Sequence, residues 1–258
     1  MSWASQRRTT YLIGIFVFLA LVFGVPIYSQ FYKTASCSDG KQNQGETAPD
    51  KGGPCILLDE RALAPASILW ARSFSVRPGI YSAVAYIENP NENAGVRAEH
   101  AVQYRFGMYD SRNILVAERT GTTFVMPGGI TPVFETNIDA GNRTIAHTYF
   151  EFTEPLIWER LNDGAKAITI NNREVLTPDS QPRVTATAEN TSVTSVSNIA
   201  FVVVVFDPGG TARSVSETTS PRLSPGEKQQ ITFTWPEPFR VKVGRVDIIT
   251  VLSPSPIK

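Results

Sequence analysis

Hydrophobic and polar residues alternate in short runs along most of the chain beyond residue 73, and turn-forming residues separate the runs. A period of two is typical of a β-strand that buries one face and exposes the other. The runs predict strands at 81–88, 101–109, 114–119, 130–135, 144–152, 183–189, 198–206, 211–218, 228–234 and 245–251. Many short strands at this spacing predict a β-sandwich fold.

Three stretches depart from simple alternation. Residues 201–206, F-V-V-V-V-F, are apolar on both faces, which is typical of a central strand that is covered on each side. As an exposed edge this strand would promote aggregation, so we expect it to be buried. Asn171-Asn172 lies between two short runs and predicts a tight hairpin over 166–176. Residues 156–161 predict a helical turn.

The second half of the pattern repeats the first. A strand, an Asn-containing turn, a strand that ends in Asp and a Pro-Gly turn follow one another twice, at nearly constant separation. Internal repetition predicts two copies of one structural unit. We therefore predict a mostly β protein with two tandem immunoglobulin-like β-sandwiches, at 67–179 and 180–258. The matched landmarks are Asn89 with Asn190, Asp110 with Asp207, and Pro127 with Pro225.

The pattern is different near the N-terminus, where the run from Tyr11 to Tyr28 is almost uninterrupted apolar sequence. At ~1.5 Å per residue, a helix over this run spans roughly 27 Å, enough to cross a thin bilayer. Arg7 and Arg8 precede the run, so the positive-inside rule places the N-terminus in the cytoplasm and the rest of the chain outside. We predict that residues 1–32 form a signal anchor in the cell membrane, with the lipid bilayer as partner.

Three other interpretations of this segment stay open. A cleaved signal peptide needs a small-x-small site soon after the apolar run, and none follows it closely. A lipoprotein processed before Cys37 needs apolar residues directly upstream, whereas the apolar run ends well before that cysteine. A buried core helix is disfavoured by the length and position of the run.

The two cysteines of the chain, Cys37 and Cys55, lie just beyond the predicted anchor. In an oxidising compartment, two cysteines this close are expected to form a disulfide. In the entropy model, a disulfide that closes a loop of this size stabilises the fold by ~3 kcal/mol, because it lowers the conformational entropy of the unfolded chain. The loop has no apolar face with which to pack a core. A covalent or ionic link must therefore order it within the juxtamembrane segment 33–66.

Four side chains of this loop offer oxygen ligands, namely Asp39, Asn43, Glu46 and Asp50. Carboxylate and amide oxygens are the ligands that calcium prefers. The same residue types also form turns without an ion, because their side chains hydrogen-bond to nearby backbone. The sequence leaves a calcium site and an ion-free turn as alternatives, and it predicts no other cofactor.

The loop resembles a short cysteine module of surface proteins, written C-x-D-G-x-x-N-x-x-E-x-x-x-D-C-G-G-x-C. Lys51 stands where the module has another cysteine, and this chain has no later cysteine to pair with one there. The resemblance therefore implies a degenerate form of the module. The matching residues are Cys37, Asp39, Gly40, Asn43, Glu46, Asp50, Gly52, Gly53 and Cys55.

Residues 106–110, F-G-M-Y-D, match the Phe-x-Leu-Tyr-Asp signature of FxLYD-type immunoglobulin-like domains, with Met108 in place of leucine. Residues 203–207, V-V-V-F-D, are a looser second match, and the turns at 190–192 and 224–226 also fit. The chain thus resembles tandem FxLYD-type domains of a membrane-anchored bacterial envelope protein. This resemblance implies extracytoplasmic β-sandwiches with no shared catalytic residues.

The balanced charge of the chain and the motifs that its sequence lacks argue against several classes of function. The 24 basic residues balance the 24 acidic ones. No positive cluster is visible that would neutralise phosphates, so we expect no nucleic-acid partner. The sequence contains no glycine-rich phosphate loop, so we expect no nucleotide. His100 and His147 lie outside any hydrolase or metalloprotease motif. We therefore predict that the protein is not an enzyme.

The remaining functions are non-catalytic. We expect the tandem sandwiches to bind an unidentified protein or component of the cell envelope, and a structural spacer in a membrane assembly is the alternative. A carbohydrate-binding module or a hydrolase is disfavoured, because exposed aromatic clusters and catalytic motifs are lacking. The predicted docking surface is Trp235, Pro236, Pro238 and Phe239. The alternative for these residues is that they end a strand and close the bottom of the sandwich.

Overall fold

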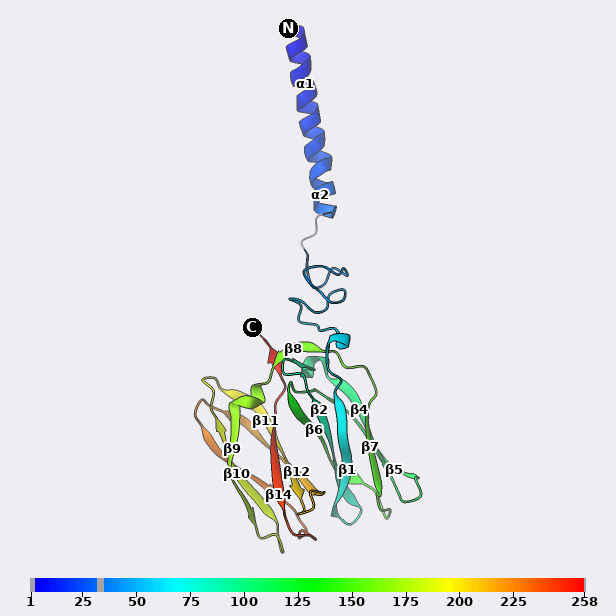
Figure 1. Cartoon of the computed structure of the whole chain (residues 1–258), viewed down its shortest axis with the longest axis vertical. Coiled ribbons are helices and arrows are strands. Elements are labelled where there is room, and N and C mark those ends of the chain that lie inside the picture. The colour runs from blue at the N-terminus through cyan, green and yellow to red at the C-terminus, as the bar shows by residue number, and fades with distance from the viewer. Residues whose placement is uncertain (1–2, 32–34, 258) are drawn as a thin grey trace. The chain divides into compact units, whose positions relative to one another are not determined.

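The computed structural model describes residues 3–31 and 35–257 of the chain. The chain divides into two compact units, Met1–Pro54 and Cys55–Lys258. The first unit holds an apolar helix and most of the cysteine loop, and the second holds the β-sandwiches (Figure 1).

The N-terminal unit begins with a continuous helix that has a short π-helical turn in its middle. The helix runs through α1 (Trp3–Leu19), η1 (Ala20–Gly24) and α2 (Val25–Phe31). The π turn ends at Gly24, two residues before Pro26, which has no N–H to donate to the preceding turn, and this missing donor accounts for the local change in winding. The segment Arg7–Tyr28 is long and apolar enough to cross a membrane, with a mean hydropathy of 2.4 and no part buried by the protein.

The first sandwich consists of two three-stranded antiparallel sheets. One sheet has the order β1 (Ser67–Arg77), β2 (Ile80–Asn89) and β6 (Gly129–Asp139), and the other has β5 (Leu115–Thr123), β4 (Val102–Tyr109) and β7 (His147–Phe152). Alternate residues of β2 and β4 face each other between the sheets and form the core. Its fully buried members include Ala83, Ala85, Ile87, Phe106, Met108 and Ile138.

The second sandwich has the same topology, which confirms the internal repeat. Its sheets have the orders β9 (Ile168–Leu176), β10 (Arg183–Asn190), β13 (Lys228–Thr234) and β12 (Ala212–Leu223), β11 (Val196–Phe206), β14 (Arg245–Val251). Strands β9 to β14 correspond, in chain order, to β1, β2, β4, β5, β6 and β7. Corresponding strands therefore pair in the same way in the two sandwiches. The predicted fold class, mostly β with two tandem β-sandwiches behind one N-terminal apolar helix, is confirmed.

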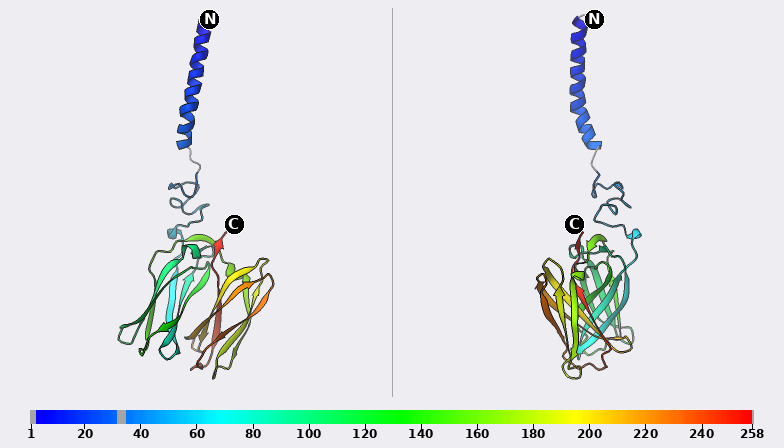
Figure 2. Two further views of the ribbon diagram at one scale, coloured as in Figure 1. Left: turned by 180° about the vertical axis from the view of Figure 1, so that it is seen from behind. Right: turned by 60° about the vertical axis from the view of Figure 1, so that its left-hand side comes forward.

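The two sandwiches pack face to face and share a third hydrophobic core (Figures 1 and 2). Side chains of β1 and β2 on one side meet side chains of β11 and β12 on the other. Both β2 and β11 are therefore apolar on both faces, because each lies between two cores. The buried members of this interdomain core are Phe74, Val84, Tyr86, Val202, Val204, Phe206, Ala212 and Val215.

A small fifth sheet closes one end of this unit. Its order is β15 (Ser255–Pro256), β8 (Glu159–Asn162) and β3 (Ala94–Gly95). Leu57 also forms a bridge to Glu159, so β8 joins the segment before β1 to the C-terminal end of the chain. The short 3-10 turns are η2 (Glu60–Ala62), η3 (Ala98–His100) and η4 (Gly164–Ala167).

Several sequence predictions need correction. The hairpin expected over 166–176 is one strand, β9, with a bulge where Asn172 adopts a φ of 52°. Because β9 pairs with β10, the second sandwich begins before residue 180 and the boundary moves to the η4 turn. Residues 156–161 contain the start of strand β8 instead of a helical turn, since pairing with β3 and β15 overrides local preference.

Candidate functional site

Each sandwich contains a fully buried asparagine at its first landmark turn. The Nδ2 atom of Asn89 donates to the carbonyl oxygens of Ala94 and Met126, at 2.7 and 2.8 Å. Asn190 makes the equivalent pair of hydrogen bonds, at 2.8 and 3.0 Å. Both side-chain oxygens also accept a backbone N–H at 3.0 Å. A buried amide that is satisfied in this way holds the turn, so these residues are structural.

Two aspartates hold the second landmark turns. Asp110 accepts a hydrogen bond from Arg143 at 2.8 Å and one from the backbone N–H of Ile114 at 2.9 Å. The Arg143 guanidinium first, and then the Ile114 amide, lower the pKa of Asp110 to about 2. Asp207 closes the equivalent turn, where a backbone N–H and then the Arg213 guanidinium lower its pKa. The hydrogen bonds of both carboxylates therefore stabilise the turns.

We expect acid to destabilise the first sandwich through Asp110. Its pKa in the folded state is depressed, so its contribution is complete above the unfolded-state pKa of about 4 and is lost as the pH falls toward 2. Asp110→Asn should therefore lower the free energy of unfolding at pH 7 and flatten its decline between about pH 4 and pH 2. Urea titrations at pH 7, 4, 3 and 2 measure this. Parallel pH profiles for the variant and the native protein would contradict the role of Asp110.

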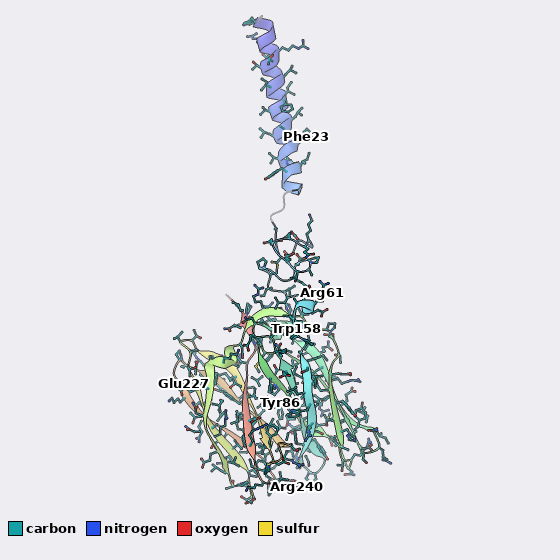
Figure 3. The ribbon with its side chains drawn as sticks, viewed as in Figure 1. Phe23, Arg61, Tyr86, Trp158, Glu227 and Arg240 are labelled. Carbon is teal, nitrogen blue, oxygen red and sulfur yellow. The ribbon has the colours of Figure 1, made fainter. Side chains whose placement is uncertain are left out.

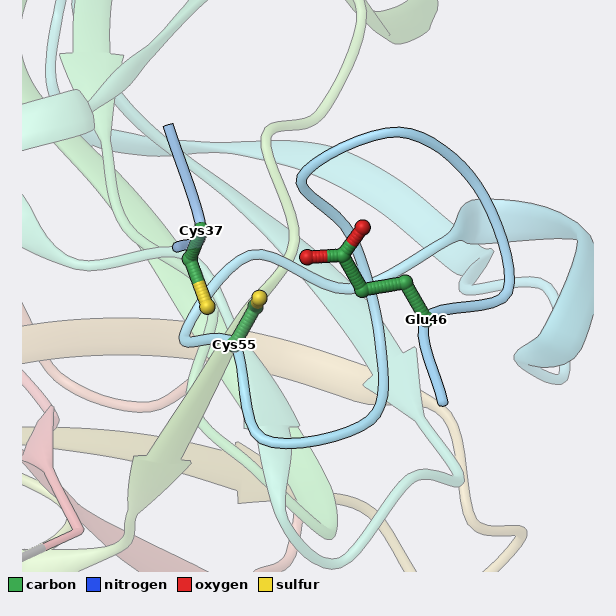
Figure 4. Close-up of side chains that lie close together, drawn as sticks. All are labelled: Cys37, Glu46 and Cys55. Carbon is green, nitrogen blue, oxygen red and sulfur yellow. The ribbon is translucent and has the colours of Figure 1, made fainter. Parts of the chain in front are cut away.

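The cysteine loop is closed by the expected disulfide between Cys37 and Cys55 (Figure 4). The loop has no apolar core, and carboxylates inside it accept hydrogen bonds from its backbone instead. The buried Glu46 accepts the backbone N–H groups of Asn43 and Asp50 at 3.1 and 3.2 Å. These hydrogen bonds order a segment that has no hydrophobic face.

The four predicted calcium ligands all take part in this network. Asp50 accepts the backbone N–H groups of Asp39 and Gly40, each at 2.9 Å. Asp39 accepts the Asn43 amide at 2.9 Å, and a backbone N–H from Lys41 lowers its pKa together with that amide. The Asn43 Oδ1 atom is buried and has no hydrogen-bond partner among the described residues. The turn geometry is thus in place without an ion, and calcium binding stays a prediction.

The predicted docking segment lies at the end of β13. Trp235 is only 7% exposed, and its Nε1 donates to the carbonyl oxygen of Val215 at 3.1 Å. The Phe239 ring packs against the indole, with 5.0 Å between ring centroids. Pro236 and Pro238 are exposed. The structure therefore places Trp235 in the sandwich core and leaves the two prolines on the surface, where docking through them stays a prediction.

A buried ion cluster stabilises the end of the unit that contains the small sheet of β15, β8 and β3. Glu159 of β8 is fully buried, Arg97 Nε lies 2.7 Å from its Oε2, and His100 Nδ1 contacts its Oε1. A buried carboxylate that loses its partners is strongly destabilising, typically by about 3–5 kcal/mol. The cluster therefore fixes the η3 turn to β8, and its role is structural.

A groove runs along the seam between β9 and β14, the end strands of the two sheets of the second sandwich. We call it the seam groove, and it consists of three cavities of about 730, 340 and 370 Å³. Arg173 of β9 lines all three cavities. Tyr86 of the first sandwich, which is labelled in Figure 3, lines the middle cavity, so both domains contribute to the groove.

Sequence reasoning did not identify this groove. The sequence feature that could have indicated the groove is the stretch R-V-K-V-G-R at 240–245, in which cations alternate with valines. Arg173 carries no such signal, because it is a single cation beside the Asn171-Asn172 bulge. Only the pairing of β9 with β10 and of β14 with β11 brings these two stretches to the same seam.

Comparisons with known proteins leave the family open. No protein-family model and no curated protein matches the chain. Among solved structures, red sea bream transglutaminase is 10% identical, with 71% of this chain and 29% of that chain covered and a TM-score of 0.23. A β-glucuronidase of Bacteroides uniformis is 11% identical, with 79% and 26% covered and a TM-score of 0.19. This chain thus spans under a third of the length of either protein, and neither likeness informs its function.

Proposed function

We propose that this chain is a non-catalytic, membrane-anchored protein of the cell envelope, whose paired β-sandwiches bind another envelope protein outside the membrane. The observation that carries the proposal is the shared interdomain core behind an apolar helix. Domains joined through such a core present their loops and edges as one fixed surface, which suits recognition of a partner.

The apolar helix supports the membrane part of the proposal. None of the segment Arg7–Tyr28 is buried by the rest of the protein, so its side chains need another apolar environment. Arg7 and Arg8 at its start favour a cytoplasmic N-terminus and extracytoplasmic sandwiches. A disulfide between Cys37 and Cys55 fits an oxidising compartment. Membership in the FxLYD-type domains belongs to the same proposal, and Phe106 and Met108 of that motif are fully buried.

A structural spacer is the second candidate. The shared core makes the two sandwiches a rigid body of fixed length, which a spacer requires as much as a binding protein does. The two functions differ in what they tolerate, because a spacer tolerates changes to exposed loops and a binding protein does not. Their partners also differ, since a spacer needs its membrane segment to meet the rest of the assembly.

Amine crosslinking in intact source-cell membranes, followed by mass spectrometry, tests the proposal. We expect exposed lysines such as Lys228 and Lys242 to crosslink reproducibly to one other envelope protein. The matched variant replaces residues 11–28 with an unrelated transmembrane segment, and the same neighbour should still be captured. Loss of the neighbour in this variant would favour the spacer, and no neighbour above background in either protein would contradict a protein-binding role.

A further inference from the structure

The outer face of the sheet of β5, β4 and β7 is free, although the matching face of the second sandwich is covered. In Figure 1 this sheet lies on the side of the first sandwich that faces away from the second. Its counterpart, the sheet of β12, β11 and β14, packs into the interdomain core through Val202 and Val204. Aligned on the landmark aspartates that follow β4 and β11, the first sandwich has Arg105 and Gly107 at these positions. The face therefore has the polar character of a terminal repeat, on which no further sandwich packs.

Two tyrosines nevertheless form an exposed aromatic pair on this face, which corrects the expectation from the sequence that exposed aromatic clusters are lacking. Tyr149 of β7 is 62% exposed. Its ring contacts the half-buried ring of Tyr109 edge to face, with 5.6 Å between ring centroids, so each ring keeps at least one face clear of the other. The fold itself does not require an aromatic ring at Tyr149, because the matched position of the second sandwich is Asp247.

Gly107 makes room for the aromatic pair. In the sheet it lies between Glu118 of β5 and Tyr149 of β7. A Cβ atom at Gly107 would lie only 2.9 Å from Cε2 of Tyr109, so the Tyr109 ring packs directly against the backbone of β4. A glycine inside a strand is typical of such a close approach. The residue without a side chain thus lets a flat aromatic surface form on the sheet.

Charged side chains lie directly beside the aromatic pair. Arg105 Nε donates to Glu151 Oε1 at 2.8 Å, and Arg105 Nη1 lies 3.4 Å from Glu118 Oε2. All three side chains are largely exposed. Among the described residues, Glu118 Oε1 and Glu151 Oε2 form no hydrogen bond, so each carboxylate keeps an acceptor that faces solvent. Donors and acceptors are therefore close together next to the rings.

A cavity of about 400 Å³ between β1 and β7 adjoins Tyr149 on the edge of the sheet. Its lining includes Tyr149, His147 and Arg72, together with the hydroxyls of Ser73 and Thr148, which hydrogen-bond to each other at 2.8 Å. The arginine of this cavity and that of the sheet face balance the two glutamates. Because the arginines and glutamates cancel, these surfaces favour an uncharged polar ligand over a strongly acidic or basic one.

A sugar ring matches this combination of groups. A pyranose has an apolar face of C–H groups, which can stack on an aromatic ring, and its rim carries hydroxyls that both donate and accept hydrogen bonds. The Tyr149 ring offers the stacking surface. Arg105 offers donors, and the solvent-facing carboxylate oxygens of Glu118 and Glu151 offer acceptors, within one residue pair of the rings.

We infer that Tyr149 and Tyr109, with Arg105, Glu118 and Glu151, form a binding site for an uncharged polysaccharide of the cell envelope. In this site a pyranose ring stacks on Tyr149, and its hydroxyls bind the three charged side chains. The inference goes beyond the proposed function, which concerns a protein partner, and it rests on that function only for the extracytoplasmic placement of the sandwiches.

Co-sedimentation tests the inference with the full chain in lipid nanodiscs and insoluble, protein-free envelope polysaccharide of the source cells. Binding should be saturable, soluble neutral fragments of the polysaccharide should compete, and empty nanodiscs should not sediment. Added salt should leave binding unchanged, because an uncharged ligand is not subject to screening. Competition by acidic fragments alone, or binding that weakens with salt, would contradict an uncharged ligand.

Two substitutions of Tyr149 separate stacking from folding. Tyr149→Ala should weaken binding at least about tenfold, because it removes the stacking surface, and Tyr149→Phe should stay within about threefold of the native chain, because it keeps the ring. The thermal midpoints of both variants should stay close to the native value, since the side chain is exposed. Val193→Ala is the matched control, because it removes an exposed apolar side chain of the second sandwich and should leave binding unchanged.

The inference would be overturned by the absence of polysaccharide binding to the native chain, or by equal binding to Tyr149→Ala. Crosslinking in membranes keeps this result apart from the proposed function. If the native chain captures an envelope protein but binds no polysaccharide, the sugar site fails and the protein partner stands. If polysaccharide binding depends on Tyr149 and no neighbour is captured, the proposed protein partner fails and the sugar site stands.

Discussion

Val204→Asp is expected to lower the free energy of unfolding of the sandwich unit by about 4 kcal/mol, because it buries an unpaired carboxylate between the two domains. Val204 is fully buried and faces the first sandwich across the interdomain core. For a unit of this size, that loss corresponds to a fall of roughly 10 °C in Tm. Scanning calorimetry measures the change and also shows whether one transition separates into two.

The control for this substitution is in the same domain. Val193 is 92% exposed, so Val193→Asp makes the same chemical change without burial and should alter stability by less than about 0.5 kcal/mol. Val84→Asp on the facing strand β2 should resemble Val204→Asp, and the double variant should lose less than the sum, because either change alone separates the faces. A native-like melt of Val204→Asp would show that the faces do not pack in solution.

Trp235→Ala is expected to destabilise the second sandwich by about 3–5 kcal/mol, the range for truncation of a buried tryptophan. The change removes the hydrogen bond to Val215 and the ring contact with Phe239. Urea titration monitored by circular dichroism measures the loss. Such a result would assign the indole to the core and leave only the exposed prolines of this segment available for docking.

Pro238→Ala provides the comparison for Trp235. Pro238 is exposed, so the substitution should leave the free energy of unfolding nearly unchanged. If the segment also contacts a partner, Pro238→Ala should reduce capture of the crosslinked neighbour without changing the melt. An unchanged melt for Trp235→Ala together with lost capture would instead place the indole at an interface.

Local patterns predicted most of the individual strands. Residues 228–234 and 245–251 are β13 and β14 with the expected bounds, because alternation of period two is clear there and turn residues flank both runs. Strand β1 (Ser67–Arg77) was not among the predicted strands, the first of which was 81–88. Its first residues are exposed and carry weak alternation, so their strand conformation depends on pairing with β2.

The pattern of residues 201–206 illustrates the limit of the sequence. Apolar residues on both faces correctly predicted a buried strand, since either face would be unstable in water. The sequence did not show which part of the protein packs on the second face of this strand, because hydrophobic burial is not directional and does not specify a partner surface. In the structure, β1 and β2 of the first sandwich pack on this second face.

The sequence by itself determined the apolar helix, the β class, the repeat and the disulfide, because each follows from local periodicity or from the spacing of two residues. The tertiary structure decided the domain boundary at β9, the interdomain core and the seam groove. Strand β9 belongs to the second sandwich because it pairs with the next strand, β10, and the residues of β9 alone do not specify that pairing. Tyr86, Arg173 and Lys242 are distant in the chain, and they line one groove only because the two sandwiches pack face to face and the β9 and β14 edges meet.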